Sequence, residues 1–383
     1  MKDRPLKVCF FGTYRANYIR HQVLLTRLAS AGVEVIECHQ RLWRDEHDRV
    51  QAASGGWLRP DFVWRVLRAY ARLIYQYLTT EDHDIVIVGY PGQFDVLLAR
   101  LLSWLRRKPL VWDILMSVYL IAKERHLDQK SALTVKSLQW VEWIACRLPD
   151  ALFLDTQVYI NWFSDTYHIP AERFHLAPLG ADEKLFQPKP EIGTDGDKFT
   201  VIYYGTFNPN SGITFIIEAA RLLQNQPEIH FELVGGGPDW DKVQELIQKY
   251  RLSNINITEW QDIKVLIKRA QRADIILGTF GTSPQALLTV QNKIYQGLAM
   301  AKVVLTGGSP AVSEFLEHKK HLYLVKRADP QAIAAAIEIL KENPSLRESL
   351  AKNGYNLFLE RLTTARLGSQ FAAQLNKIVR QNK

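Results

Sequence analysis

Glycines follow three apolar runs in the second half of the chain, where strands would end and helices begin. One is Gly205 in the segment 203–212, and the others lie in the segments 231–238 and 277–284. A glycine at the end of a strand lets the backbone approach a ligand, and the helix that follows points free N–H groups at any phosphate there. The segments therefore indicate phosphate binding, although a tight strand-to-helix turn would need the same glycines.

A polar helix start follows the third glycine segment. Lys293 and Gln296 are three residues apart, so they share one face of the predicted helix, and Asn292 precedes them. A lysine at a helix N-terminus opposes the helix dipole and is stabilised there by a bound anion or by reaching solvent. Lys293 is thus a candidate phosphate ligand, with a solvated surface lysine as the alternative.

The first half of the chain offers two further candidates. The loop 12–15 follows the first predicted strand, and its Arg15 could meet a phosphate or an acidic acceptor. Asp113 follows the strand 110–112, where a carboxylate faces the ligand edge of an α/β sheet. An exposed loop arginine and a helix-capping or ion-paired aspartate are the corresponding structural alternatives.

Several chemistries lack their sequence signatures. The chain has no P-loop, no G-x-G-x-x-G in a dinucleotide-binding context, no H-E-x-x-H and no G-x-S-x-G elbow. Three Asp-x-Asp pairs, at 82–84, 195–197 and 239–241, are typical of solvated turns. The cysteines are too few and too scattered for a disulfide framework or a metal cluster: Cys9, Cys38 and Cys146. We therefore expect neither a metal nor a cofactor.

The elements that must position these residues alternate along nearly the whole chain. Continuous apolar strands separated by helices are typical of an α/β fold with a parallel sheet covered on both faces. We predict strands at 8–11, 33–38, 85–88, 110–112, 151–154, 201–204, 231–234, 255–258, 275–277, 303–305 and 322–325. We predict helices at 18–31, 213–223, 242–250, 265–270, 293–300, 332–341, 346–359 and 365–379.

A change of composition divides the chain. The segment 181–198 carries prolines and glycines and little apolar periodicity, so it reads as a linker. We predict doubly wound domains at 1–180 and 199–362, followed by a C-terminal stretch at 363–383. Eight of the ten tryptophans lie before residue 165, which indicates that the two domains do different work.

Composition and charge narrow the setting. The chain has 383 residues and a net charge of +8, which suits a phosphate-bearing substrate, an anionic lipid surface or a nucleic acid. Nucleic acid is disfavoured because the basic residues are dispersed and no recognition motif is present. No apolar run approaches the roughly 18 residues of a membrane-spanning helix, and a signal peptide is not evident. We expect a cytoplasmic protein, free or at the inner face of the membrane.

The segment 57–78 combines an apolar and a basic set of residues at helical spacing. The apolar set is Trp64, Leu67, Ala71, Ile74 and Leu78, and the basic set is Arg65, Arg68 and Arg72. Such a helix can lie on an anionic bilayer. A helix packed in the core with a solvated basic face gives the same pattern, so both interpretations stay open.

These motifs together resemble the GT-B-fold retaining glycosyltransferases of family 4, most strongly from residue 203 to about residue 358. The family opens its second domain with a strand, Gly-Arg-x-x-x-x-Lys-Gly and a helix, matched by 205–212. Its Gly-x-Gly-Pro turn is matched by 235–238, and its donor loop and helix by 291–304. The glycine loop of its first domain is similar to 12–13, and its His-Asp pair to 112–113.

The chain departs from the family at charged positions. The basic pair that holds the donor diphosphate falls on Thr206 and Ser211, the two glutamates on Thr289 and Gln296, and the histidine on Trp112. Neutral residues thus replace two cations, two anions and an imidazole. The resemblance implies that the diphosphate relies instead on backbone N–H groups after Gly205, on Lys293 and on Arg15.

The resemblance implies two Rossmann-like domains that face each other across a cleft, with the stretch 363–383 crossing back to the first. It implies metal-free transfer of a hexose-type sugar from UDP or GDP with retention, through a front-side mechanism, to a saccharide or lipid-linked acceptor bound by the first domain. The implied catalytic residues are Asp113 and Lys293. The implied donor-binding residues are Gly205, Thr206, Asn208, Gly235, Gly237, Trp260, Gly281, Thr282, Thr289, Asn292, Lys293 and Gln296. The implied acceptor or phosphate loop consists of Gly12, Thr13, Tyr14 and Arg15.

Two other functions fit the same fold. A donor-binding protein or partner subunit with impaired catalysis would explain the lost charges. A nucleotide-sugar 2-epimerase would need acidic groups for proton chemistry, and the predicted site is depleted of them.

Overall fold

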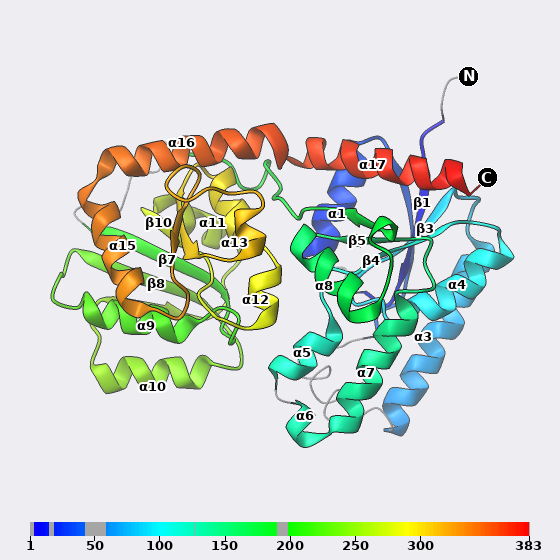
Figure 1. Cartoon of the computed structure of the whole chain (residues 1–383), viewed down its shortest axis with the longest axis horizontal. Coiled ribbons are helices and arrows are strands. Elements are labelled where there is room, and N and C mark those ends of the chain that lie inside the picture. Colours follow the sequence, from blue (N-terminus) through cyan, green and yellow to red (C-terminus); the bar gives the residue numbers. More distant parts are fainter. Residues whose placement is uncertain (1–3, 15–18, 43–58, 126, 190–197, 383) are drawn as a thin grey trace. The chain divides into compact units, whose positions relative to one another are not determined.

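The computed structural model describes residues 4–14, 19–42, 59–125, 127–189 and 198–382 (Figure 1). The chain divides into two compact units, Met1–Pro178 with Thr364–Lys383, and Leu179–Thr363. Each unit is built on its own six-stranded sheet, and within both sheets the paired strands are parallel. The α/β class predicted from the alternation of apolar runs and helix-period segments is confirmed.

The first unit has the strand order β2-β1-β3-β4-β5-β6. Its strands are β1 (Lys7–Gly12), β2 (Glu34–His39), β3 (Ile85–Val88), β4 (Leu110–Asp113), β5 (Ala151–Leu154) and β6 (Phe174–Leu176). Its helices are α1 (Ile19–Ser30), α3 (Pro60–Thr79), α4 (Asp95–Leu105), α5 (Val118–Glu124), α6 (Leu127–Lys130), α7 (Ala132–Ala145), α8 (Gln157–Tyr167) and α17 (Thr364–Gln381), with a 3₁₀ turn at Ala171–Arg173. Strand β6 is the one described strand that the sequence did not predict.

Helices cover both faces of the first sheet. Successive strand residues point to opposite faces, and on β1 the Phe10 ring packs against His21 of α1 while the Phe11 ring packs against Tyr77 of α3. Helices α1 and α3 therefore lie on opposite faces. Phe371 of α17 joins the cluster on the Phe10 side, so α17 shares that face with α1.

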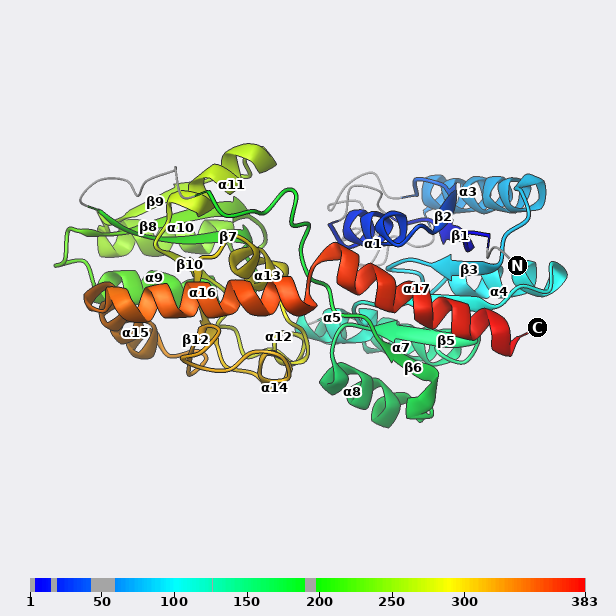
Figure 2. The same ribbon diagram turned by 90° about the horizontal axis from the view of Figure 1, so that it is seen from above.

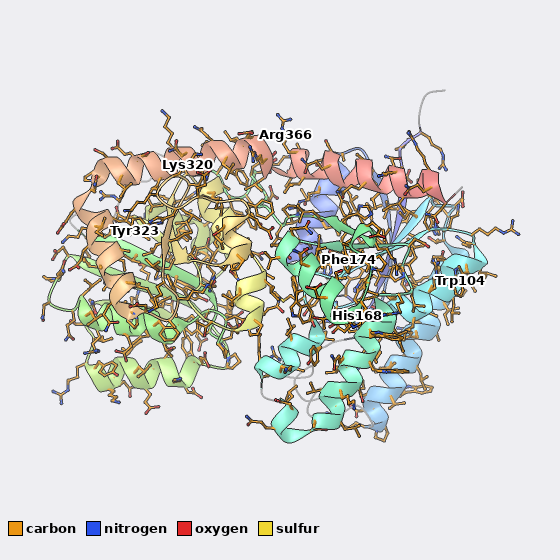
Figure 3. The ribbon with its side chains drawn as sticks, in the orientation of Figure 1. Trp104, His168, Phe174, Lys320, Tyr323 and Arg366 are labelled. Carbon is orange, nitrogen blue, oxygen red and sulfur yellow. The ribbon has the colours of Figure 1, made fainter. Side chains whose placement is uncertain are left out.

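The last helix of the chain packs closely on α1 (Figure 2). A side chain at Gly368 would clash with the carbonyl oxygen of Arg27, and Ser30 Oγ donates a hydrogen bond to the carbonyl oxygen of Thr364 at 3.3 Å. Arg366 is exposed on the outer side of α17 (Figure 3). The first unit is thus completed by a segment that follows the second unit in the sequence.

The second unit has the strand order β12-β11-β10-β7-β8-β9. Its strands are β7 (Phe199–Thr206), β8 (Ile229–Gly236), β9 (Ile255–Thr258), β10 (Ile275–Leu277), β11 (Val303–Gly307) and β12 (Tyr323–Val325). Its helices are α9 (Ile213–Leu222), α10 (Trp240–Tyr250), α11 (Ile263–Arg272), α12 (Pro284–Leu288), α13 (Asn292–Ala299), α14 (Pro310–Ser313), α15 (Pro330–Glu342) and α16 (Pro344–Arg361).

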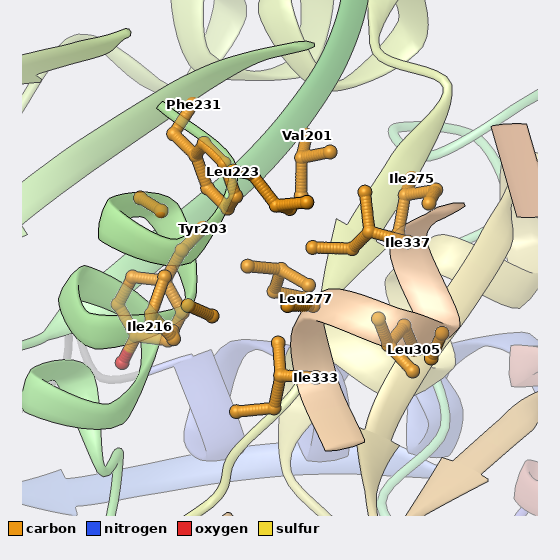
Figure 4. Packing of buried hydrophobic residues seen from close by; sticks show 14 of the residues in the cluster. Val201, Tyr203, Ile216, Leu223, Phe231, Ile275, Leu277, Leu305, Ile333 and Ile337 are labelled. Atoms are coloured by element: carbon orange, nitrogen blue, oxygen red, sulfur yellow. The ribbon is translucent and has the colours of Figure 1, made fainter. Parts of the chain in front are cut away.

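Two apolar clusters hold the helices of the second unit to its sheet. Val201, Leu277 and Leu305 pack with Ile216 of α9 and Ile333 of α15 on one face (Figure 4). On the opposite face, the intervening strand residues pack with α13 and α16. Burial on both faces explains why the strands are continuously apolar rather than alternating.

The start of the predicted linker is packed rather than free. Leu179, Ala181 and Phe186 belong to the apolar cluster of the second unit, and Gln271 donates a hydrogen bond to the carbonyl oxygen of Gln187 at 2.9 Å. The remainder of the predicted linker, residues 190–197, lies outside the described residues. Searching the described helices for one that could cross a membrane finds none with the necessary length and apolar character.

Candidate functional site

The strand order of the second sheet reverses beside β7, because β8 and β9 lie on one side of it and β10 to β12 on the other. Ligands of doubly wound sheets bind at such a point, outside the carboxyl ends of the strands. Strand β7 ends at Gly205 and Thr206, and β10 leads into Gly278. The segments predicted to bind a donor therefore converge at this reversal point.

Gly205 and Lys293 are brought together from segments 88 residues apart. Gly205 has φ +145°, a conformation that favours glycine, and Lys293 Nζ lies 2.9 Å from where a Cβ on Gly205 would be. Lys293 is the second residue of α13, and its ammonium also sits over the Tyr203 ring, 3.6 Å from the centroid. The missing side chain of Gly205 thus makes room for the cation at the end of β7.

The charge of Lys293 is poorly compensated within the protein. The residue is 8% exposed, and burial lowers the pKa of its ammonium well below the usual range. Its ring contact is a cation–π interaction, and among the described residues no carboxylate forms an ion pair with it. A buried ammonium without a counter-ion is costly to the free protein and is suited to meet an anion.

The turn after β7 is closed by its own polar side chains. Asn208 Oδ1 accepts a hydrogen bond from the Ser211 N–H at 2.9 Å, and Ser211 Oγ accepts one from the Asn208 N–H at 3.2 Å. Ser211 Oγ also donates to the Asn208 carbonyl at 2.6 Å, so its hydroxyl is used within the turn. Thr206 is exposed at the same edge. Gly212 (φ +63°) then starts α9.

The glycines after β8 allow close backbone packing. A Cβ on Gly235 would clash with the carbonyl oxygen of Gly205, and one on Gly237 would come within 2.6 Å of the Phe207 carbonyl oxygen. Gly236 is more open, and Trp260 lies beside it with its Nε1 3.5 Å from the corresponding position. Trp260 is exposed, so its ring is available to a ligand.

A chain of hydrogen bonds holds the loop between β10 and α13. Thr279 Oγ1 donates to Gln291 Oε1 at 3.0 Å, Gln291 Nε2 donates to Thr289 Oγ1 at 3.1 Å, and Thr289 Oγ1 donates to the Gln285 carbonyl at 3.0 Å. Thr289 is buried and part of this chain. Its contacts give it a loop-ordering role, and its assignment to the donor stays a prediction.

The first turns of α13 carry three of the predicted donor residues. Asn292 begins the helix half-buried, and Lys293 and Gln296 are buried one turn apart. The N–H groups of a helix start add partial positive charge to that of Lys293. This end of α13 therefore concentrates positive potential beside Gly205.

A buried arginine that the sequence did not single out braces the next loop. Arg327 Nε donates to the Gly308 carbonyl and its Nη1 to the Gly281 carbonyl, each at 2.7 Å, while its Nη2 is buried and finds no hydrogen-bond partner among the described residues. Burial lowers the pKa of Arg327 to about 10. Gly281 packs against Pro209 of the β7 turn, and Thr282 beside it is exposed. No motif surrounds Arg327 in the sequence, so only the fold reveals it.

In the first unit, the loop after β1 is held by a buried carboxylate. The Thr13 N–H donates to Asp95 Oδ2 at 2.7 Å, and Tyr70 OH donates to Asp95 Oδ1 at 2.8 Å. Burial raises the pKa of the Asp95 carboxyl, and these hydrogen bonds act in the opposite direction. A Cβ on Gly12 would come within 2.7 Å of Asp95 Oδ2. Asp95 is thus a site-shaping residue that the sequence did not single out.

Of the two other residues of that predicted loop, the structure describes one. Tyr14 is buried and donates a hydrogen bond to Glu37 Oε2 at 2.6 Å, so it fixes the loop to β2. Arg15 lies outside the described residues. The acceptor role of the loop stays a prediction.

Asp113 is held by an arginine of α1. Arg20 Nε donates to Asp113 Oδ2 at 2.9 Å, and Arg20 Nη2 donates to Oδ1; the side chains are 2% and 0% exposed. Both carboxylate oxygens are therefore engaged in a bidentate pair. The geometry gives Asp113 a structural partner, and its catalytic assignment stays a prediction. Trp112 next to it is fully buried, and within the described part of the chain its Nε1 has no hydrogen-bond partner.

Comparison with known proteins agrees with this architecture. Residues 187–357, within the second unit, match the family model described as Glycosyl transferases group 1. The chain is similar to an alpha-D-kanosaminyltransferase of Streptomyces kanamyceticus, 24% identical over 85% of this chain and 83% of the relative. It is also similar to the lipopolysaccharide core biosynthesis glycosyltransferase LpsD of Rhizobium meliloti (strain 1021), 26% identical over 43% of this chain and 45% of that protein.

Solved structures share the fold at low sequence identity. Sucrose-phosphate synthase (tll1590) from Thermosynechococcus elongatus superposes with a TM-score of 0.75 at 14% identity, over 99% of this chain and 100% of that one. Anabaena Alr3699/HepE in complex with UDP gives 0.71 at 14% identity, over 97% and 100%. The fold is therefore the GT-B fold of two Rossmann-like units. The second unit matches the glycosyl transferases group 1 model over most of its length.

Proposed function

We propose that the chain is a retaining glycosyltransferase that moves a sugar from a UDP- or GDP-linked donor to a saccharide or lipid-linked acceptor in glycan biosynthesis. The observation that carries the proposal is Lys293, a buried ammonium beside Gly205 at the strand reversal of a glycosyl transferases group 1 domain. A diphosphate would supply the missing counter-charge. The relatives that are named as glycosyltransferases, and the neighbour solved with UDP, support the same class.

In the proposed reaction, the bond from the anomeric carbon to the donor diphosphate breaks while a bond to the acceptor hydroxyl oxygen forms on the same face. The hydroxyl proton passes to an oxygen of the leaving diphosphate. Lys293 and the N–H groups at the start of α13 stabilise the charge that develops on that diphosphate. The protein otherwise orients the two substrates, which lowers the entropic part of the barrier.

We propose that no metal takes part in this chemistry. Within the described part of the chain, no three or more histidine, cysteine, aspartate or glutamate side chains lie together as a set of metal ligands. Lys293 offers one of the cationic charges that a divalent ion would otherwise supply. We expect transfer and nucleotide binding to be unchanged by EDTA.

A donor-binding protein without turnover is the second candidate. The hydrogen bonding of Ser211 favours this candidate, because the Ser211 hydroxyl is bound within its own turn and Thr206 carries no charge. The two positions that hold cations in the resembled family are therefore neutral here, and Lys293 would stand without them.

Calorimetric titration with UDP, GDP, UDP-glucose and GDP-mannose tests the site. One nucleotide series is expected to bind. At a concentration of 100 times Kd, that nucleotide should raise the free energy of unfolding by about 2.7 kcal/mol. Lys293→Met should weaken that binding at least tenfold. Lys352→Met, which changes an exposed lysine of α16, should not. Equal binding by all three proteins, or none by wild type, contradicts the proposed donor site.

Turnover separates the two candidate functions. Nucleoside diphosphate release in the presence of acceptor extracts, with the anomeric configuration of the product read by NMR, should show retention. Binding without release across the donors that bind would support the second candidate.

A further inference from the structure

Three neighbouring helices of the first unit each expose an apolar stripe. Trp64 of α3, Trp104 of α4 and Trp140 of α7 are 65%, 58% and 65% exposed. The other large apolar side chains exposed on or beside these helices are Val63, Leu67, Tyr75, Leu78, Phe94, Leu97, Leu101, Leu105, Leu133 and Trp143. Together, these thirteen residues are called the apolar layer. It is much larger than the scattered exposed leucines of an ordinary surface.

Hydrogen bonds place α3, α4 and α7 in a single layer over one face of the sheet. Tyr70 of α3 donates to Asp95 of α4 at 2.8 Å, and Arg106 after α4 donates to the Leu78 carbonyl of α3 at 2.9 Å. Gln93, just before α4, donates to Glu142 of α7 at 3.0 Å. In Figure 2 these helices are spread across the unit, with α4 between α3 and α7, and Trp104 of α4 is labelled in Figure 3.

The exposed stripes are not the sides that hold the helices to the sheet. Helix α3 packs inward through Phe62, Ala69, Leu73 and Tyr77, and these side chains are buried. Trp64, Leu67, Tyr75 and Leu78 lie on the opposite side. The core therefore does not require the apolar layer, and its apolar character calls for a partner outside the unit.

The exposed charged side chains on these three helices are almost all basic. The three helices contain three acidic residues: Asp95 and Glu142 are buried, and Asp61 forms an ion pair with Arg59 at 2.7 Å. The exposed basic residues on or immediately after these helices are Arg68, Arg72, Arg107 and Lys136. Glu81 and Asp82, beyond the end of α3, are paired with Lys7 at 3.5 Å and with Lys108 at 2.7 Å.

Guanidinium groups also stand over two rings of the layer. Arg147 lies over Trp143, 3.7 Å from the ring centroid, and Arg100 lies over Trp104 at 4.8 Å. Exposed tryptophan rings are suited to the headgroup region of a bilayer, where the ring is half in hydrocarbon. Arg100 is paired with Asp150 and Arg147 donates to backbone carbonyls, so these two cations hold the rings in place, and lipid phosphate is left to the exposed basic residues named above. The absence of unpaired exposed carboxylates on the three described helices favours an anionic surface over a protein partner of mixed charge.

We propose that the apolar layer of α3, α4 and α7 docks this protein on an anionic lipid bilayer. Exposed apolar side chains enter the headgroup boundary, and the exposed cations Arg68, Arg72, Arg107 and Lys136 contact lipid phosphates. The surface stands independently of the donor site in the second unit. Docking would bring a lipid-linked acceptor within reach of the protein, and this part of the inference rests on the proposed function.

Vesicle co-sedimentation tests the docking surface. We expect the full chain to bind vesicles of phosphatidylcholine with 30% phosphatidylglycerol at least tenfold more strongly than phosphatidylcholine alone, and to lose most of that preference in 0.5 M NaCl. The triple variant Trp64→Ser, Leu101→Ser and Trp140→Ser should reduce binding to anionic vesicles at least tenfold. Arg68→Gln with Arg72→Gln should reduce the preference for anionic over neutral vesicles.

A matched control uses exposed apolar residues of the second unit. Leu222→Ser, Ile339→Ser and Leu359→Ser remove similar side chains from α9, α15 and α16 and should leave vesicle binding unchanged. The melting temperature and nucleotide affinity of both triple variants should match wild type, which separates failure of docking from failure of the donor site. Absence of vesicle binding by wild type, or equal loss in both triple variants, overturns the proposal. A dimer in sedimentation velocity that only the first triple variant dissociates also overturns it, in favour of a second copy as the occupant.

Discussion

Lys293 shows how a single buried side chain can link ligand binding to stability. Burial lowers the pKa of its ammonium, and the described residues supply no carboxylate to offset the cost. The free protein therefore binds fewer protons at this site than the unfolded chain does. The contribution of Lys293 to the free energy of unfolding thus rises with pH until the lysine of the unfolded chain titrates, at about 10.4. A bound diphosphate would favour the charged form and reverse the shift.

Binding of a nucleotide sugar should therefore take up protons. Between the pKa of Lys293 in the free protein and its higher value in the complex, affinity should fall as pH rises. Calorimetry of UDP-glucose binding in two buffers of different ionisation enthalpy measures the uptake directly, and the nucleotide series that binds can be substituted. Lys293→Met should bind without this component. Equal buffer dependence in the variant would assign the uptake to another group.

Lys293→Met should also stabilise the ligand-free protein. An apolar side chain of similar length keeps the packing against Tyr203 and removes the buried charge, so we expect a gain of about 1 kcal/mol or more. Urea unfolding of wild type and variant without nucleotide gives the difference. A less stable variant would show that the ammonium is satisfied in the free protein.

Replacing Asp113 is expected to lower the stability of the protein, because its carboxylate pairs with a buried arginine. Asp113→Asn leaves Arg20 buried with a weakened partner, and breaking such a pair costs about 3–5 kcal/mol. Urea unfolding measures the loss, and replacing Arg20 with methionine and Asp113 with leucine together should recover much of it. A variant that keeps wild-type stability but loses turnover would instead support the catalytic assignment.

Individual residues were predictable where the chemistry is local in sequence. Lys293 and the glycine turns stand in recognisable segments, whereas Arg20 and Asp113 are 93 residues apart and meet only through the sheet. Arg327 and Asp95 likewise take their importance from carbonyls and hydroxyls that distant segments bring to them. A sequence without its fold contains no signal for such pairs.

At the scale of elements, periodicity located helix α3 without settling which of its sides faces the core, and it set no bounds for helices such as α4, α7 and α8. Helix α3 carries large apolar residues around most of its circumference, so two different stripes satisfy helical spacing. The stripe that contains Trp64 and Leu67 is exposed, and the core side runs through Phe62, Leu73 and Tyr77. The interpretation as a core-packed apolar stripe is therefore wrong for these exposed residues.

Strand β6 was missed because it is short and lacks a continuous apolar run. Its three residues, Phe174, His175 and Leu176, pair with β5 at the edge of the sheet. Longer strands such as β7 and β8 were found because both of their faces are buried, which requires an uninterrupted apolar sequence. Pairing that depends on a neighbouring strand is not recorded in the composition of so short a segment.

Arg327 makes a prediction about the loops that follow β10 and β11. Arg327→Met removes hydrogen bonds to the carbonyls of Gly281 and Gly308, so we expect faster amide exchange in residues 278–283 and a stability loss of about 1–3 kcal/mol. Nucleotide affinity should fall through this loosening. Hydrogen exchange by mass spectrometry checks the first effect, with Lys326→Met, an exposed neighbour, as the control. Unchanged exchange in this loop would remove Arg327 from the site.

For the whole molecule, the contact of α17 with α1 predicts that replacing a glycine inside a helix with alanine will lower stability instead of raising it. Glycine to alanine inside a helix normally stabilises by roughly 0.5–1 kcal/mol. At Gly368, however, the added Cβ would meet the carbonyl oxygen of Arg27, so Gly368→Ala should destabilise the first unit. Thermal unfolding measures the change. Ser369→Ala, at an exposed position of the same helix, should be neutral or slightly stabilising; stabilisation by both would mean that α17 is not closely docked.

The placement of α17 also orders events during synthesis. The second unit is continuous in sequence, so its sheet and helices are available once residue 363 has left the ribosome. The first unit is translated earlier, yet the helix that covers Phe10 and Phe153 of its sheet and packs on Leu24 of α1 emerges only after the second unit. The N-terminal half must therefore wait with an apolar face uncovered while the later half folds, and that interval is when a nascent-chain chaperone would have a surface to hold.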